Sequence, residues 1–445
     1  MTTPIIDFVR SYAETGPVRM HMPGHKGRAY LGPEALDITE IEGADVLYPA
    51  RGIIRESEDN ASALFGSRRT FYSTEGSSLC IRAMLYLAGI HARLQGRTAC
   101  IAAGRNAHRV FAEAAALLDL EIRWIGQGDS LLRCEINPAG LEALFDDPHE
   151  SPNAVFVTSP DYLGNMADLS ALAEVCHRHG ALFLVDNAHG AYLRFLPGKR
   201  HPLDCGADIC CDSAHKTLPV LTGGAYLHLS ASCPPELDEM AERALALFAS
   251  TSPSYLILQS LDLANALLCA DYPGKLAGAV SAAAALRKKL TDGGWLLAGS
   301  EPLKITLCPK SRGYTGNDLA ERLISAGIYP EFSDPDFLVL MISPENGLSG
   351  LEQVKNALFA CPQRAPITGL PPAAPHCEQV LTPRQAMLLP FLRLPAEQCL
   401  GRILSSPSVG CPPAVPICFC GERINSQALE LFRYYGIQSC DVIRD

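Results

Sequence analysis

The stretch that decides the fold is Asp212-Ser213-Ala214-His215-Lys216-Thr217, which follows the apolar run 207–211. A second apolar run, 181–185, leads into Asp186-Asn187-Ala188-His189-Gly190. Continuous apolar strands of this kind are typical of a sheet that is covered on both faces. In α/β folds the carboxyl ends of such strands carry the ligand-binding residues. We therefore expect both polar stretches to lie at the same edge of one sheet.

Lys216 and Asp186 are the two protein groups that pyridoxal 5'-phosphate (PLP) chemistry requires. The cofactor needs a lysine amine to form an imine and a carboxylate that keeps its pyridine nitrogen protonated. Taken singly, the lysine would be read as a surface charge and the aspartate as a helix N-cap. Together they predict a PLP site, in which Ala188 leaves room for the ring and His189 faces the substrate.

The segment Gly76-Ser77-Ser78 is the predicted phosphate site. It precedes a helix-like stretch, 79–87. Backbone N–H groups, hydroxyls and the helix dipole all favour an anion at a helix N-terminus. We expect Ser213, three residues before the lysine, to be a further phosphate ligand. Glu75 places an acidic side chain directly before this segment.

Several apolar runs alternate with helical patterns. Strands separated by helices of 10–15 residues indicate βαβ units and a largely parallel sheet. The predicted strands are 99–103, 121–125, 154–158, 181–185, 207–211 and 225–228, and the helices between them include 110–118 and 169–179. His108 follows the first of these strands, and we predict that its ring stacks on the cofactor.

The chain divides into five predicted parts. An α/β large domain binds PLP, and a smaller α+β domain follows it. In the smaller domain we expect strands at 303–307 and 337–341 and helices at 317–326 and 351–359. The parts are an N-terminal arm, 1–60, with one helix near 5–15; the large domain, 61–255; a helical connection and small domain, 256–361; a proline-rich linker, 362–375; and a tail module, 376–445.

Composition narrows the functional classes. The net charge of −11 argues against nucleic-acid binding, which needs a basic surface. The start of the chain has no basic and apolar pattern of a signal peptide, and no run of about 18 apolar residues predicts a membrane span. We expect a cytoplasmic protein whose 17 cysteines are reduced and mostly buried, with no metal site.

These residues together resemble the ornithine/lysine/arginine decarboxylase family of fold-type-I PLP enzymes. The resemblance covers nearly the whole chain. The specific motifs are His21-Met22-Pro23-Gly24-His25-Lys26-Gly27 and Ser213-Ala214-His215-Lys216, and less specific matches include Arg105-Asn106-Ala107-His108 and Thr158-Ser159-Pro160.

The resemblance implies decarboxylation of a basic amino acid (arginine, lysine or ornithine) to an amine that serves as a polyamine precursor. It implies a homodimer or larger assembly, and it places His215 beside the imine. Under it, Lys216, Asp186, His108, His215 and His189 are the catalytic residues. The cofactor ligands are Gly76, Ser77, Ser78, His108, Asp186, Ala188, Ser213, His215 and Lys216.

Two alternatives remain open at this point. Another fold-type-I enzyme, such as an aminotransferase or a carbon–sulfur lyase, would share the same cofactor residues. An aminotransferase usually clamps the substrate carboxylate with an arginine, and Arg312 and Arg322 are available. A PLP-binding protein with degenerate activity is the other alternative, suggested by Glu75 and Asp161.

Overall fold

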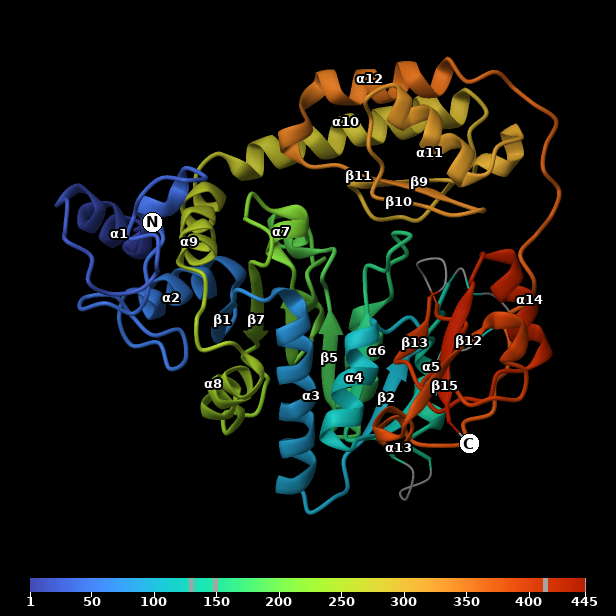
Figure 1. The fold of residues 1–445 in the computed structure, drawn as a ribbon, viewed down its shortest axis with the longest axis horizontal. Helices are drawn as coiled ribbons and strands as arrows, with labels where there is room; N and C mark the ends of the chain where they lie inside the picture. The colour runs from blue at the N-terminus through green and yellow to red at the C-terminus, as the bar shows by residue number, and fades with distance from the viewer. Residues whose placement is uncertain (127, 129–130, 132, 147–150, 411–414, 445) are drawn as a thin grey trace. The chain divides into compact units, whose positions relative to one another are not determined.

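One seven-stranded sheet carries the polar stretches at its strand ends. The computed structural model describes residues 1–126, 128, 131, 133–146, 151–410 and 415–444. The strand order is β1-β7-β6-β5-β4-β2-β3 (Figure 1). The bounds are β1 (Arg69–Ser73), β2 (Cys100–Gly104), β3 (Glu121–Ile125), β4 (Ala154–Thr158), β5 (Leu182–Asp186), β6 (Ile209–Asp212) and β7 (Ala225–Leu229). β5 and β6 are parallel, and β7 runs antiparallel to both β1 and β6.

The mostly parallel sheet confirms the predicted fold class. The bounds of β3 and β4 are those predicted, and the other predicted strands shift by one or two residues. The prediction missed β1, whose residues are all buried. The sequence of β1 does not read as an apolar run, because it begins with the charged residue Arg69. In the structure Arg69 is nevertheless only 7% exposed. An ion pair of 3.4 Å with buried Glu58 lets this arginine lie inside the protein.

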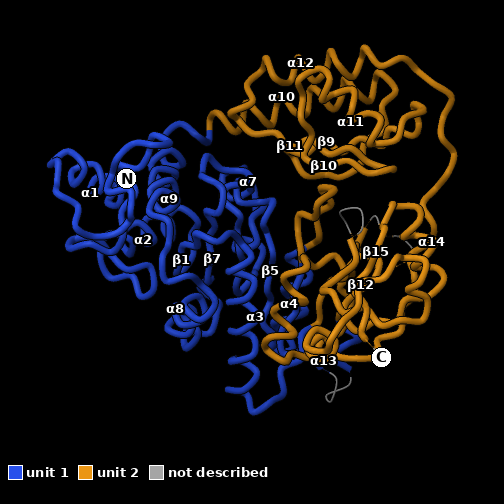
Figure 2. The backbone as a smooth tube through the Cα atoms, in the orientation of Figure 1, with its two compact units in different colours: residues 1–101, 142–157, 169–273 blue, residues 102–141, 158–168, 274–445 orange. Residues whose placement is uncertain are grey.

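Contacts within the chain form two compact units, shown in Figure 2. Unit 1 comprises residues 1–101, 142–157 and 169–273, and unit 2 comprises 102–141, 158–168 and 274–445. The sheet strands are divided between the two. The five predicted parts follow sequence order, whereas these units interleave, and the predicted domain boundaries remain a prediction.

Helices surround the unit 1 strands. The long helix α3 packs against β6 and β7 and against α8, a helix that the sequence did not predict. The helices that lie wholly in unit 1 are α1 (Pro4–Glu14), α2 (Ile53–Phe65), α3 (Gly76–Leu94), α6 (Leu169–Arg178), α7 (Ala214–Thr217), α8 (Leu237–Phe248) and α9 (Tyr255–Cys269). In the part of the chain that the structure describes, none of the helices is long and apolar enough to cross a membrane.

Unit 2 contains a four-stranded sheet with the order β10-β11-β9-β8 and a C-terminal module with two two-stranded antiparallel sheets, β12–β15 and β13–β14. A buried cluster that includes Leu404, Ile424 and Phe432 forms the core of this module. The strands are β8 (Leu297–Ala298), β9 (Lys304–Leu307), β10 (Phe332–Ser333), β11 (Leu338–Met341), β12 (Phe391–Pro395), β13 (Ser408–Val409), β14 (Cys418–Phe419) and β15 (Ser439–Ile443). The remaining helices are α4 (Arg109–Leu118), α5 (Pro138–Ala143), α10 (Tyr272–Asp292), α11 (Gly316–Ser325), α12 (Gly347–Phe359), α13 (Pro383–Leu388) and α14 (Ser426–Tyr434).

Candidate active site

Lys216 lies on the short helix α7, directly after β6. Its Nζ atom is 3.1 Å from Nε2 of His189, which follows the end of β5 by three residues. The two polar stretches that were predicted to share one edge of the sheet therefore meet there. Both side chains come from segments anchored by buried parallel strands, so the sheet fixes their separation.

Asp186 is the last residue of β5 and is only 3% exposed. Its Oδ1 accepts a hydrogen bond of 3.1 Å from the backbone N–H of Ala188. This contact folds the chain sharply after the strand and fixes the orientation of the carboxylate. Ala188 itself is buried, and its methyl group is the smallest side chain that an L-residue can place there.

Beneath this turn lies Asp212, which is fully buried. It accepts hydrogen bonds from Nδ2 of Asn187 at 2.6 Å and from Nε2 of His201 and His228 at 2.9 and 3.3 Å. Burial alone would raise the pKa of Asp212, but the two imidazoles hold it well below its usual value. This carboxylate joins the end of β6 to the residue that follows Asp186. Sequence reasoning missed its role, and the available signal was a charged residue closing an apolar strand.

The predicted phosphate segment forms the start of α3, a helix of 19 residues. Gly76 has a φ of +68° and donates its N–H to the carbonyl of Gly223 at 2.7 Å. The hydroxyl of Ser213 donates to that of Ser77 at 2.8 Å, and Ser78 lies half-buried in the same helical turn. Hydroxyls gathered at the N-terminus of a long helix are the donors that a phosphate group requires.

Glu75 does not turn toward these hydroxyls. Its side chain is exposed, and Oε1 accepts a hydrogen bond of 2.7 Å from the backbone N–H of Ser250. The acidic side chain that precedes the phosphate segment is therefore hydrogen-bonded to the loop after α8.

His215 lies beside the start of α3. Its Nδ1 is 3.0 Å from the carbonyl oxygen of Gly224, and a Cβ on Gly76 would stand 3.8 Å from its Cε1. A carbonyl only accepts hydrogen bonds, so Nδ1 carries the proton and Nε2 of the neutral ring is the basic atom. His215 thus has a defined tautomer in which Nε2 can take up a proton.

In unit 2, His108 caps the N-terminus of α4. Its Nδ1 accepts a hydrogen bond of 3.3 Å from the backbone N–H of Val110, and the residue is exposed. Three residues earlier, Arg105 forms a buried ion pair with Glu422, with contacts of 2.6 and 3.1 Å. The pair fixes the loop that ends at His108. No pattern in the sequence predicts this ion pair, and the stacking role of His108 remains a prediction.

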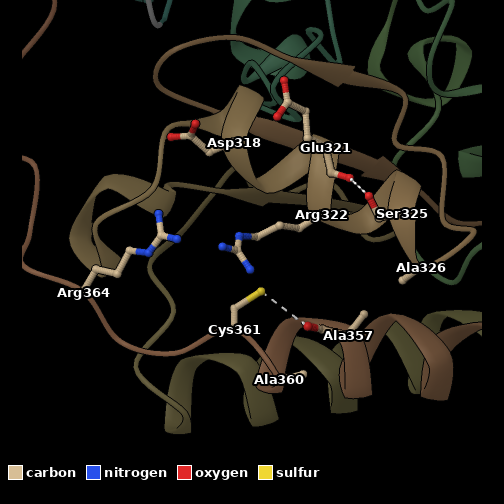
Figure 3. A pocket seen from close by; sticks show the side chains of 9 residues that line it. All are labelled: Asp318, Glu321, Arg322, Ser325, Ala326, Ala357, Ala360, Cys361 and Arg364. Atoms are coloured by element: carbon tan, nitrogen blue, oxygen red, sulfur yellow. Dashed lines mark hydrogen bonds between the residues drawn. The ribbon is translucent and has the colours of Figure 1, made fainter.

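A separate pocket of about 570 Å³ lies in unit 2 between α11 and α12 (Figure 3). It contains Arg322 and no predicted site residue. Arg312 donates to the carbonyl of Gly293 at 2.7 Å and lies over the ring of Trp295 at 4.7 Å. The guanidinium of Arg312 is thus engaged in packing, which weakens its candidacy as a carboxylate clamp. The pocket is lined by Asp318, Glu321, Arg322, Ser325, Ala326, Ala357, Ala360, Cys361 and Arg364.

The unit 1 residues fit the chemistry of PLP. They supply an amine, a buried carboxylate and a hydroxyl pair at a helix N-terminus. The hydroxyl of Thr217, next to Lys216, is buried and has no hydrogen-bond partner among the described residues. A polar ligand would satisfy such a group, since burying an unpaired hydroxyl costs about 1–3 kcal/mol.

Comparisons with known proteins identify the family of the chain. The family described as Orn/Lys/Arg decarboxylase, major domain, matches residues 3–309. This chain belongs to that family. An uncharacterised protein of Bacillus subtilis, YaaO, is 30% identical to this decarboxylase over 97% of the chain and 93% of the relative. An arginine decarboxylase of the same organism is 28% identical over 96% of the chain and 92% of the relative.

Solved structures show the same fold. The constitutive lysine decarboxylase of E. coli matches with a TM-score of 0.77 and 17% identity, covering 100% of this chain and 82% of that one. Lysine decarboxylase A from Pseudomonas aeruginosa matches with a TM-score of 0.78 and 15% identity, covering 99% and 80%. The chain is therefore a fold-type-I enzyme, an amino-acid decarboxylase whose cofactor is PLP, as the sequence predicted. The family match favours the decarboxylase over the alternatives, which were an aminotransferase, a carbon–sulfur lyase and a PLP-binding protein with degenerate activity.

Proposed function

We propose that this decarboxylase removes CO2 from a basic amino acid: arginine, lysine or ornithine. The observation that carries the proposal is the 3.1 Å approach of Lys216 to His189 at the strand edge that also holds buried Asp186. Arginine is the first substrate to test, because four relatives that match over nearly the whole chain are named arginine decarboxylases.

In this proposal Lys216 would hold the cofactor covalently, Asp186 would pair with its ring nitrogen, and Ser77, Ser78 and Ser213 would bind its phosphate. When bound, PLP supplies an electron sink for the pair of electrons that the departing CO2 leaves behind. Gly76 and Ala188 leave space for the backbone to approach the group. His108 would stack on its ring, as the family resemblance implies.

The surrounding residues act on protons and on water. His189 orients the Lys216 amine through the Nζ–Nε2 contact. His215, with Nδ1 held by Gly224, offers Nε2 as the atom that takes up or returns a proton. The near-complete burial of Asp186 keeps water from its carboxylate, which strengthens its interaction with a positive charge.

The proposed function includes an assembly state, a cellular compartment and a use for the product. We infer a homodimer or larger assembly that works in the cytoplasm and makes an amine for polyamine synthesis. The family resemblance supports this inference. The net charge of −11 and the absence of any membrane-spanning helix among the described residues are compatible with it.

The test begins with the purified protein, PLP and an absorbance spectrum between about 300 and 500 nm, where an imine of PLP absorbs. Arginine, lysine and ornithine are then assayed separately for CO2 and amine. Lys216→Ala should lose the imine band and all activity, whereas Lys199→Ala, an exposed lysine of the same unit, should keep both. A band without CO2 from any of the three substrates would overturn the substrate class.

A further inference from the structure

Two cysteine thiols of unit 2 lie against each other outside the active site. The Sγ atoms of Cys377 and Cys418 are 3.3 Å apart. Cys418 is fully buried on β14, and Cys377 is partly exposed in the segment that follows the proline-rich linker. A disulfide needs a sulfur–sulfur distance of about 2.0 Å. To form the bond, the two sulfur atoms must move closer together by rotation about their side-chain bonds.

The backbone on both sides of the pair is fixed. After Cys377, the carbonyl of Glu378 accepts from the N–H of Arg423 at 2.9 Å. Before it, the carbonyl of His376 accepts from Nδ2 of Asn425 at 3.1 Å. On the other side, Cys418 pairs in register with Val409. Both thiols are therefore held in place by hydrogen bonds that do not depend on the sulfur atoms.

The two thiols differ in reactivity. A hydrogen bond joins the two thiols, and either sulfur can be its donor. The contact with Cys418 lowers the pKa of Cys377 below its ordinary value. The same contact, together with burial, raises the pKa of Cys418. The partly exposed thiol is thus the one that ionises first, and the thiolate is the reactive form of cysteine. The buried thiol of Cys418 lies next to it.

A nearby pair shows that proximity alone is not enough. Cys399 and Cys440 also lie close together in the C-terminal module, but both are buried and the pKa of each is raised. Neither thiol combines exposure with easy ionisation. Cys377 is different in both respects.

We propose that Cys377 and Cys418 are a thiol modification site that reacts with hydroperoxides to form a reversible disulfide. The thiolate of Cys377 attacks one peroxide oxygen, the O–O bond breaks, and the other oxygen leaves as water or an alcohol after taking a proton. The sulfur of Cys418 then attacks the sulfenic acid on Cys377, the S–O bond breaks, and the hydroxyl leaves as water with the thiol proton. The two sulfurs lose two electrons, which the peroxide gains. A dithiol reverses the reaction by exchange.

The pair is better suited to this chemistry than to metal binding. The nearest carboxylate is Glu422, and both of its oxygens are already engaged. Oε1 and Oε2 accept from Arg105, and Oε2 also accepts from the backbone N–H of Phe419 at 2.9 Å. A metal ion would have to displace Arg105 from a buried ion pair, which is costly.

The test uses the full-length holoenzyme, reduced and then freed of reductant. After one equivalent of hydrogen peroxide, remaining thiols are blocked with N-ethylmaleimide and the protein is digested for mass spectrometry. We expect a peptide that contains Cys377 joined to one that contains Cys418, with the bond absent after treatment with dithiothreitol. Exposed Cys269 reports on general oxidation in the same sample.

Three variants locate the bond. Cys420→Ser is the matched control, because Cys420 is buried two residues beyond Cys418 and its Sγ contacts the carbonyl of Ser405 at 3.3 Å. This variant should cross-link like the wild type. Cys418→Ser should leave a sulfenic acid on Cys377 that dimedone labels, and Cys377→Ser should leave Cys418 unoxidised.

Several results would overturn the proposal. One is oxidation of Cys269 while the Cys377 and Cys418 peptides stay fully alkylated in the wild-type enzyme. Another is a cross-link to Cys418 that persists in Cys377→Ser. A third is a stoichiometric zinc ion in the enzyme as purified that is lost from both serine variants, since it would assign the pair to metal binding. The wild-type mapping decides the question even if a variant fails to fold.

Discussion

Nζ of Lys216 lies 3.1 Å from Nε2 of His189, so the Lys216 amine is positioned by the segment that follows a different strand. Lys216 follows β6 and His189 follows β5. The contact couples the orientation of the amine to the same turn that holds Asp186.

Replacing His189 by alanine is expected to lower kcat about 100-fold, because the amine loses its neighbour and proton transfer near it slows. Steady-state kinetics across pH, with PLP saturating, measures the effect. His189→Gln should recover part of the rate, since an amide can still contact the amine. His179→Ala serves as the control, as His179 is exposed and contacts Glu142. An unchanged pH profile in His189→Ala would remove His189 from the reaction.

Asp186→Asn tests the charge without changing the shape. The amide oxygen can still accept from Ala188, so the turn should survive. We expect kcat to fall by about 100-fold or more, since a preorganised charge in a buried site is worth about that much. Kinetics with a PLP titration and a thermal melt separate catalysis from folding. Wild-type activity in this variant would show that Asp186 is only structural.

The hydroxyls of Ser77 and Ser213 are expected to act as one unit. Either alanine variant should weaken PLP binding about tenfold, the effect of losing one hydrogen bond to a charged group. The double variant should lose less than the product of the two effects, because the hydroxyls contact each other at 2.8 Å. A fluorescence titration with PLP gives the dissociation constants. Ser260→Ala, whose hydroxyl bonds to the carbonyl of Ile257, is the control. Strictly multiplicative losses would contradict the shared contact.

Asp262 is expected to make stability depend on pH. It is fully buried on α9 and accepts from the backbone N–H groups of Ile5 and Ile6 at 3.0 Å. Burial raises the pKa of Asp262 to about 6, against about 3.9 in an unfolded chain. The folded protein therefore binds this proton more tightly, so the Asp262 contribution is most favourable below about pH 4 and declines as pH rises through about 6.

The decline should amount to about 3 kcal/mol. Urea unfolding of wild type and Asp262→Asn at several pH values between 4 and 7 measures it. The variant should gain stability relative to the wild type as pH rises. Asp59→Asn removes an exposed carboxylate of α2 and should show no such trend. A constant difference between wild type and Asp262→Asn would refute the assignment.

The strand ends of the site could be predicted because each apolar run is a local pattern and the polar residue after it is adjacent in sequence. Lys216 and His189 meet because β5 and β6 are parallel neighbours in the sheet. The role of Asp212 could not be predicted, because its partners His201 and His228 come from separate segments. β1 was not predicted because the charged residue Arg69 interrupts the apolar pattern of a strand that is buried in the structure.

The tautomer of His215 is a second feature that could not be predicted from the sequence. The sequence places this imidazole next to Lys216, but the carbonyl that sets its proton belongs to Gly224, nine residues later. Likewise, the direction of Glu75 depends on Ser250, which lies 175 residues away. Residue type and position were predictable, whereas hydrogen-bond partners required the folded chain.

Arg105 and Glu422 are separated by 317 positions, and both are almost completely buried. On the ribosome the arginine emerges first, and its partner carboxylate is translated only near the end of the protein. Until Glu422 is made, the Arg105 guanidinium in the loop that leads to His108 lacks this partner, so its burial is unfavourable. The loop that leads to His108 should therefore reach its folded arrangement only after the segment that contains Glu422 has been translated.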